Sequence, residues 1–392
     1  MLHSLFWLTI GIVLYTYSIY LLILWISCIN RKRNNSSETN INQLPEVTIV
    51  IAAHNEERYV LAKYQNTLTL NYPSSKLFQI WVDDGSTDST HELLSTLNGI
   101  KLISNPERLG KAQSINNAMK LVKTPFTVFT DANTFLSQNS IIDLIKHLEN
   151  SEVGCVAGQK KIVWSDSDAL ASKGEGLYWR FESFIKMAES CTGSTLSATG
   201  ELYAIRTNLF KPLPTNTILD DFEVSACIIK QGYKVKYEDA AVASEAGSLT
   251  VEEEKKRKVR IAAGCFQALS RHVCLLNPFK NTEVAFKFFS HKFLRWVLVP
   301  PAIFAAPLLN AAILFLYPNS SIIYLISMLA IAFIYLFVVA GYLFRNRSNM
   351  HPMVTFPYYG FMMNVTMLKG LIYFFAGKQT HIWEKANRKA DI

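Results

Sequence analysis

The apolar residues of the chain are concentrated in two stretches near its ends. No charged residue or histidine occurs from Ser4 to Asn30, and no charged residue occurs from Trp296 to Phe344. The first stretch is long enough for one α-helix to cross a bilayer core of about 30 Å. The second is long enough for two such helices, which we expect at 297–317 and 321–344. Most charged residues lie between 45 and 290, which predicts a soluble domain between two membrane regions.

A further apolar stretch at 355–377 differs because it contains proline, asparagine and lysine. The basic cluster Arg31–Arg33 follows the first stretch, and positive charge marks the cytoplasmic end of a span. A third C-terminal span would place the basic tail, 378–392, on the opposite side of the membrane. We therefore expect 355–377 to be a re-entrant or interfacial segment.

Short apolar runs alternate with amphipathic segments in the central part of the chain. The runs, rich in β-branched residues, are VTIVIAA, FQIWVDD, IKLISN, FTVFTD and VGCVAGQ. The helix-like segments between them include RYVLAKYQNTLTL, STHELLSTLN, KAQSINNAMKLV and SIIDLIKHLEN. This alternation predicts an α/β domain with a mostly parallel sheet, in which ligands bind at the carboxyl ends of the strands. Asp83, Asp84 and Asp131 fall at such ends.

Two amphipathic segments, 251–272 and 282–296, come after this domain and are expected to be helices on the membrane interface. The predicted organisation is a transmembrane helix, a polar linker, a cytosolic domain, interface helices, a C-terminal membrane region and a cytosolic tail. Their ranges are 1–30, 31–44, 45–250, 251–295, 296–377 and 378–392.

The net charge of the 392-residue chain is +8, but its basic residues do not form long runs. They form short clusters at 31–33, at 255–258 and around 345–347, for which the positive-inside rule and anionic lipids account. We therefore expect membrane lipids as partners, and no nucleic acid. The six cysteines have neither CxxC nor zinc-site spacing, which indicates that they are reduced.

Asp131 and Asn133 follow a strand in FTVFTDAN. Two oxygen ligands at this spacing can hold a divalent ion such as Mg²⁺ or Mn²⁺ that bridges two phosphates. The alternative is an ordinary Asp-x-Asn turn.

Asp83 and Asp84 close another strand in WVDDGSTD, where carboxylates can accept hydrogen bonds from a ribose or a nucleobase. Gly85 allows a tight turn after them. The alternative is an Asp-Gly turn in which Asp88 caps the next helix.

Asp220 and Asp221 have apolar neighbours in ILDDFEVSACIIKQG, which predicts that at least one carboxylate is partly buried. Two adjacent like charges raise the pKa of one of them, which suits a general base. The alternative is a pair of acids at the N-terminus of a helix.

Three basic residues, Arg257, Lys258 and Arg260, lie in the first amphipathic segment after the domain. Arginine is suited to bidentate phosphate binding. The alternative for Arg257 and Lys258 is contact with lipid head groups.

The order of these motifs resembles the family 2 inverting glycosyltransferases of GT-A fold, specifically the membrane-bound branch that includes the cellulose, hyaluronan and poly-N-acetylglucosamine synthases. The resemblance covers about residues 45–300. It implies a Rossmann-like mixed sheet with helices on both faces. It also implies metal-dependent transfer from a UDP-sugar to a lipid-linked or growing glycan acceptor, with inversion to a β-linked product. The expected location is the cytoplasmic face of a bacterial inner membrane, together with other envelope glycan biosynthesis proteins.

The resemblance also implies a role for individual residues. Asp221 would be the catalytic base and Asp220 its neighbour, Gly200 and Glu201 would lie on the acceptor side, and a metal would bind Asp131 and Asn133. The donor would be bound by Ala53, Asn55, Glu56, Asp83, Asp84, Gly110, Lys111, Asn116, Asp131 and Arg260.

Two departures from the family pattern change the expected product. The DxD motif is Asp131-Ala132-Asn133, which keeps an oxygen ligand but has one charge fewer. The QxxRW motif of processive synthases aligns with 257–261, where arginine replaces the glutamine and isoleucine the tryptophan. We therefore expect transfer of one or a few sugars, with processive polymer synthesis as the alternative. From other classes, the alternatives are an inactive membrane scaffold and a nucleotide-sugar sensor.

Overall fold

The computed structural model describes two units, which are treated separately below. The described residues are 1–29, 44–163, 170–246, 251–345 and 350–377. The sheet unit contains 44–163 and 179–246, and the helical unit contains 1–27, 170–178, 251–345 and 350–377. The block predicted at 45–250 is thus interrupted, because 170–178 belongs to the helical unit.

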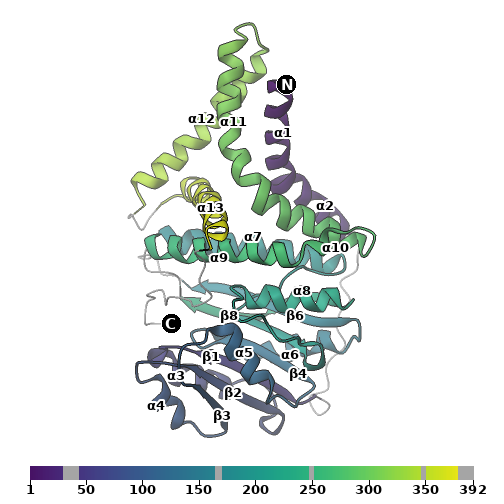
Figure 1. Cartoon of the computed structure of the whole chain (residues 1–392), viewed down its shortest axis with the longest axis vertical. Coiled ribbons are helices and arrows are strands. Elements are labelled where there is room, and N and C mark those ends of the chain that lie inside the picture. Colours follow the sequence, from purple (N-terminus) through teal and green to yellow (C-terminus); the bar gives the residue numbers. More distant parts are fainter. Residues whose placement is uncertain (30–43, 164–169, 247–250, 346–349, 378–392) are drawn as a thin grey trace. The chain divides into compact units, whose positions relative to one another are not determined.

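An eight-stranded mixed sheet, in the order β3-β2-β1-β4-β7-β6-β8-β5, forms the centre of the sheet unit (Figure 1). Strands β3, β2, β1 and β4 are parallel neighbours, β7 runs antiparallel to β4 and β6, and β6 pairs in parallel with β8. The strands are β1 (Val47–Ala53), β2 (Leu77–Asp84), β3 (Ile100–Asn105), β4 (Phe126–Asp131), β5 (Phe135–Leu136), β6 (Val153–Val163), β7 (Leu202–Arg206) and β8 (Lys234–Ala246). The five apolar runs identified in the sequence are all strands.

The register of the parallel strands places the predicted acids at one edge of the sheet. Ala53 of β1 lies opposite Asp83 of β2, and Ala52 lies opposite Asp131 of β4. Strand β1 is almost completely buried because VTIVIAA carries small and β-branched side chains on both faces. The carboxyl end of β1 therefore lies between the two aspartates.

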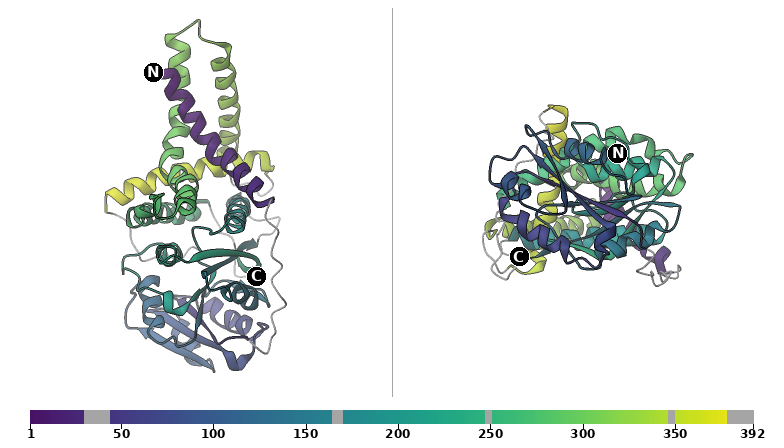
Figure 2. Two further views of the ribbon diagram at one scale, coloured as in Figure 1. Left: turned by 90° about the vertical axis from the view of Figure 1, so that its right-hand side faces the viewer. Right: turned by 90° about the horizontal axis from the view of Figure 1, so that it is seen from below.

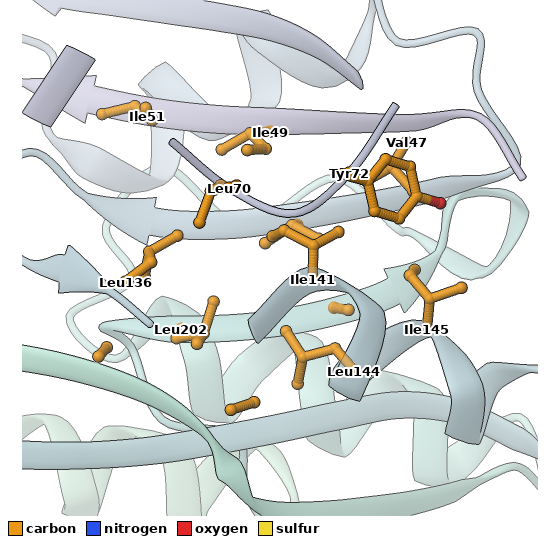
Figure 3. Close-up of a cluster of buried hydrophobic side chains, with 14 of the residues drawn as sticks. Val47, Ile49, Ile51, Leu70, Tyr72, Leu136, Ile141, Leu144, Ile145 and Leu202 are labelled. Atoms are coloured by element: carbon orange, nitrogen blue, oxygen red, sulfur yellow. The ribbon is translucent and has the colours of Figure 1, made fainter. Parts of the chain in front are cut away.

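The helices of the sheet unit cover this core. In α6, buried Ile141, Leu144 and Ile145 repeat at helical spacing and belong to one buried cluster with Ile49 and Ile51 of β1 (Figure 3). Burying each of these side chains contributes about 1.5–3 kcal/mol. The helices are α3 (Glu57–Leu68), η3 (Ser74–Lys76), α4 (Thr90–Ser95), α5 (Lys111–Met119), α6 (Ser140–Leu148), η4 (Thr207–Leu209), α8 (Asp220–Lys230) and the C-terminal part of α7 (Leu170–Cys191).

The helical unit has three helices long and apolar enough to cross a membrane: Leu2–Ile29, Thr282–Leu316 and Ile322–Leu343. Helix α1 packs against α11, and α11 against α12 (Figure 1, Figure 2). The elements are α1 (Leu2–Leu14), η1 (Tyr15–Ile19), α2 (Tyr20–Ile29), α9 (Val251–Arg271), η5 (Val273–Leu276), α10 (Thr282–Lys287), η6 (Phe288–Leu298), α11 (Val299–Leu316), α12 (Ile322–Leu343) and α13 (Pro352–Phe375).

Two segments of the helical unit differ from the sequence-based expectation. The boundary expected at 295/296 is absent, because α10, η6 and α11 form one helix from Thr282 to Leu316 that continues through a π-helical segment. Helix α13 is unbroken from Pro352 to Phe375, so it has no re-entrant turn. Within this helix, the Asn364 amide donates to the Gly360 carbonyl at 2.8 Å. An interfacial position of α13 stays a prediction.

Candidate active site

The predicted acids come together at the carboxyl edge of the sheet. Asp83 and Asp84 are the last two residues of β2, Asp131 is the last residue of β4, and Asp220 and Asp221 begin α8. The Lys111 ammonium, at the start of α5, lies 2.7 Å from Asp131 Oδ1 and 3.4 Å from Asp220 Oδ2. One cation thus links the end of β4 to the start of α8.

The charge state of this group follows from its burial. Burial alone would lower the pKa of Lys111, but the carboxylates of Asp131 and Asp220 outweigh it and raise the pKa. Burial raises the pKa of Asp220, while the nearby Lys111 ammonium acts in the opposite direction. The site therefore holds a permanent cation among carboxylates that are only partly neutralised.

Asp221 has the properties of a general base. Burial, followed by the charge of Asp220, raises the pKa of Asp221 to about 6, while Lys186 and Lys111 act in the opposite direction. A base with a pKa close to the working pH is ionised and still accepts a proton readily. A Cβ placed on Gly200 would lie 3.6 Å from the Asp221 carboxylate, so the predicted acceptor-side turn borders the base.

The chain segment before Gly200 is fixed against α8. The Lys186 ammonium, on α7, donates to the Ala198 carbonyl at 2.8 Å and to Thr199 Oγ1 at 2.9 Å. The Ala198 amide donates to Ser225 Oγ at 2.7 Å, and Ser225 Oγ donates to the Asp221 carbonyl at 2.6 Å. Because these groups are buried and satisfied, the turn is held rigidly beside the base.

Asp84 is fully buried and organises the loop that leads to Lys111. Its carboxylate accepts hydrogen bonds of 2.9–3.0 Å from Asn105 Nδ2, Ser114 Oγ and the amides of Leu109 and Gly110. Gly110 has φ = 90°, which favours glycine. These contacts give Asp84 a positioning role, and its direct contact with a donor stays a prediction.

Asp83 lies next to the turn made by Gly85. Its Oδ1 accepts from the Ser86 amide at 3.1 Å, and its Oδ2 lies 3.1 Å from His91 Nδ1. Gly85 has φ = 63°, and a Cβ there would come within 2.5 Å of the Glu107 backbone. Glycine is thus required for the close approach of the loop that precedes Lys111.

Three more residues predicted to bind the sugar donor, Ala53, Asn55 and Glu56, lie at the end of β1 and in the loop after it. Asn55, at φ = 55°, accepts from the Thr87 amide at 2.8 Å, and the Glu56 amide donates to Thr90 Oγ1 at 2.7 Å. The loops after β1 and β2 are thereby tied together beside Ala53.

Two further residues were predicted to bind the sugar donor, Asn116 and Arg260. Asn116 uses both ends of its amide on the backbone of Leu213, at 2.8 Å each. Arg260 lies on α9 in the helical unit. Their contacts with a donor stay predictions.

The Asp131-Ala132-Asn133 turn offers oxygen atoms of the type that Mg²⁺ and Mn²⁺ prefer. The Lys111 ammonium beside Asp131 and Asp220 shows that these carboxylates accommodate a cation. Over the described residues, no cluster of three or more His, Cys, Asp or Glu side chains is arranged to hold a metal ion. Asp131 and Asn133 could therefore supply two oxygen ligands to such an ion, and a metal at this turn stays a prediction.

Four buried charged residues at the site were missed by sequence reasoning: Lys63, Lys160, Lys186 and Glu245. Lys63 lies under the metal-motif turn and donates to Thr130 Oγ1 at 2.9 Å and to the Thr134 carbonyl at 2.7 Å. Burial lowers the pKa of Lys63 to about 7. The available signal was its place on the buried stripe of α3, in phase with Val60 and Thr67.

The comparisons with known proteins agree with this geometry. Residues 48–210 match the family described as Glycosyl transferase family 2. This part of the protein is therefore a family 2 glycosyltransferase domain, and the family, the fold class and the enzyme class predicted from the sequence are confirmed.

The similar proteins are bacterial synthases and an archaeal transferase. The chain is 24% identical over 246 residues to the poly-beta-1,6-N-acetyl-D-glucosamine synthase of Staphylococcus aureus, covering 61% of this chain and 59% of that one. The synthase of Staphylococcus epidermidis is also 24% identical, covering 65% of both chains. A solved mannosyltransferase from Pyrobaculum calidifontis, in complex with GDP-Man and Mn²⁺, has a TM-score of 0.69 at 21% identity, over 97% of this chain and 100% of its own. The chain thus spans 59% of the length of its S. aureus relative.

Proposed function

We propose that this protein transfers a sugar from a UDP-sugar to a lipid-linked or growing glycan acceptor at the cytoplasmic face of a bacterial membrane, with inversion. The observation that carries the proposal is the buried Asp221 carboxylate, with its raised pKa, beside Gly200 and the partly neutralised acids Asp131 and Asp220. This arrangement combines a base with a cation-binding edge at the end of a parallel sheet.

In the proposed reaction, Asp221 accepts the proton of the acceptor hydroxyl as its oxygen forms a bond to the anomeric carbon. The bond from that carbon to the nucleoside diphosphate breaks on the opposite face, so an α-linked donor gives a β-linked product. Lys111 keeps Asp131 and Asp220 in place and offsets their charge near the leaving diphosphate. When bound by Asp131 and Asn133, Mg²⁺ or Mn²⁺ would supply charge neutralisation for the diphosphate.

The similar proteins support parts of this proposal. The complex of the archaeal mannosyltransferase supports a divalent ion and makes GDP-mannose a donor that needs testing beside UDP-sugars. The staphylococcal relatives are polymer synthases, which favours processive synthesis as the second candidate. Against it, Ile261 stands where processive synthases of the resembled branch have tryptophan. An inactive scaffold is the candidate from another class.

Three apolar helices that could cross a membrane support the membrane location and a role for lipids as partners. The basic cluster that follows the first of them in the sequence supports a cytoplasmic position for the sheet unit. Other envelope glycan biosynthesis proteins are proposed as partners on the basis of the staphylococcal relatives.

The test is nucleotide release by the detergent-purified protein from a panel of UDP-sugars and GDP-mannose, with Mn²⁺, with Mg²⁺ and with EDTA. The expected result is release from one donor that EDTA abolishes and that Asp131→Ala lowers by about 10²-fold. Product length on a lipid-linked acceptor separates addition of one or a few sugars from polymer synthesis. If no donor binds or is consumed, the scaffold becomes the better assignment.

A further inference from the structure

The metal-motif turn has a neighbour on β8 that the proposed reaction does not use. Asn133 Nδ2 donates a hydrogen bond to Glu245 Oε1 at 3.3 Å. A carboxylate accepts hydrogen bonds and does not donate them, so the NH₂ group of the Asn133 amide has to face Glu245. The amide oxygen, at the other end of the same planar group, is then directed away from Glu245.

Glu245 is itself fixed by a buried lysine. Its Oε2 lies 2.6 Å from Lys160 Nζ, and the same ammonium lies 2.5 Å from Glu201 Oε1. The Lys160 side chain, on β6, is wholly buried, and its Nζ lies 4.9 Å from the centre of the Trp179 ring. The carboxylates of Glu201 and Glu245 thus share the Lys160 ammonium.

The contacts form a chain from the acceptor-side turn to the metal motif: Glu201, Lys160, Glu245 and Asn133. Resting on the proposed function, we propose that Glu245 is a positioning residue for Asn133. It orients the amide oxygen toward the cation edge and supplies beside the turn the negative charge that an aspartate at 133 would carry.

This assignment explains why asparagine suits position 133. An aspartate there would place its carboxylate about 3.3 Å from Glu245 Oε1, where two like charges repel and no hydrogen bond forms. With a carboxylate at 245 and an amide at 133, the pair has one negative charge and one hydrogen bond. With the two groups exchanged, an acid at 133 and an amide at 245, the pair again has one negative charge and one hydrogen bond.

The experiment compares the full-length wild-type protein with Asn133→Asp, Glu245→Gln and the double variant in detergent. Mn²⁺ affinity is measured by direct binding without donor, and Tm is measured in EDTA. Glu238→Gln is the matched control, because Glu238 is also a buried acid on β8 but pairs with Lys146 and His147. If Glu245→Gln does not fold, Glu245→Asp withdraws the carboxylate from Asn133 while keeping its charge.

The expected affinities follow the charge of the pair. Asn133→Asp tightens Mn²⁺ binding about tenfold, Glu245→Gln weakens it about tenfold, and the double variant returns to within about threefold of the wild type. In EDTA, the Tm of the double variant should fall by less than the two single-variant decreases added together, because the hydrogen bond between positions 133 and 245 is restored. Glu238→Gln leaves Mn²⁺ affinity unchanged.

Additive Tm shifts, or an unchanged Mn²⁺ affinity in Glu245→Gln, would overturn the assignment. The Tm comparison needs neither metal nor donor, so it decides the coupling even if no sugar transfer is found. Failure of the proposed function would instead appear as a wild-type protein that releases no nucleotide from any donor.

Discussion

The protein contains two clusters of buried charge that are built differently. In the helical unit, Arg257 of α9 pairs with Glu175 of α7 and, at 3.2 Å, with Glu254. Glu254 also accepts a hydrogen bond from the Tyr359 hydroxyl of α13 at 3.0 Å and lies 3.4 Å from Lys258. In this cluster, two acids face two bases and a hydroxyl donor, and it joins three helices.

The cluster at the carboxyl edge of the sheet unit has more acids than bases. Lys111 bridges Asp131 and Asp220, and the buried Asp221 follows directly in the chain. The pKa of Arg257 is raised because the charges of Glu175 and Glu254 outweigh the effect of burial. The pKa of Asp221 is raised because burial and the nearby charge of Asp220 both disfavour its ionised form. The first cluster is complete as it stands, while the second is suited to binding a cation or a proton.

The first cluster also bears on the basic residues near 257. Sequence reasoning gave Arg257 and Lys258 a phosphate or a lipid head group as partner. Both face Glu254 inside the helical unit instead, and Lys258 lies 5.0 Å from the centre of the Tyr178 ring. The pattern of charges on one helix could not show this, because the acid Glu175 comes from a helix 82 residues away in sequence.

The strongest test of the comparison is Asp221→Asn. The amide keeps the shape of the side chain but cannot accept the acceptor proton, so transfer should fall by about 10³–10⁴-fold. Donor binding, measured by titration with a non-hydrolysable nucleotide sugar, should stay within about tenfold of the wild type. Transfer at more than about a tenth of the wild-type rate would remove Asp221 from the role of base.

Arg257→Met should have the next largest effect, on stability rather than chemistry. Removing one partner of a buried ion pair leaves Glu175 and Glu254 uncompensated, at a cost of about 3–5 kcal/mol in unfolding free energy. Denaturation of the detergent-solubilised protein measures this loss. Nucleotide release per folded molecule should stay near the wild-type value, and a selective loss of release would contradict a purely structural role.

Asp131→Ala should lower donor turnover by about 10²-fold, because the cation edge loses a ligand while the base remains. Its effect on stability should be small, because Asp131 is partly exposed and Lys111 keeps Asp220 as a partner. Turnover with increasing Mn²⁺ is the measurement. If saturating metal has no effect in the wild type, the metal role of this residue is wrong.

The pH dependence should follow Asp221. Since its pKa is about 6, turnover should rise about tenfold per pH unit below 6 and level off above it. The free energy of unfolding should change in the opposite sense and fall as the pH rises. The folded pKa lies above the ordinary 3.8, so this carboxyl contributes stability at low pH that is lost as the pH rises through about 6. Rate and Tm profiles of wild type and Asp221→Asn measure both, and identical Tm profiles would contradict the raised pKa.

Much of the fold could be predicted from local pattern. The buried runs such as VTIVIAA became strands because an apolar run of that length cannot be left in water, and strand ends located Asp83 and Asp131. The pairing of Glu245 with Asn133 could not be predicted, because 112 residues separate them and β8 reaches this edge only through the sheet order. Asp84 shows the same limit. Its sequence context suggested a ligand contact, which stays a prediction, but could not show the buried hydrogen bonds by which it fixes a loop.

The smallest effects should come from a matched pair of tyrosines, Tyr359 and Tyr203. Tyr359→Phe removes a donor to the buried Glu254 carboxylate and should cost about 1.5 kcal/mol in unfolding free energy. Tyr203 is buried in β7 and stacked on Phe129, with a centroid distance of 4.7 Å. Its hydroxyl has no hydrogen-bond partner within the described part of the chain, so Tyr203→Phe should be neutral or slightly stabilising. Denaturation curves of both variants decide this. A larger loss of unfolding free energy for Tyr203→Phe than for Tyr359→Phe would mean that the acidic cluster of the sheet unit depends on the Tyr203 hydroxyl. The proposed difference between a satisfied structural cluster and an incompletely neutralised catalytic cluster would then be wrong.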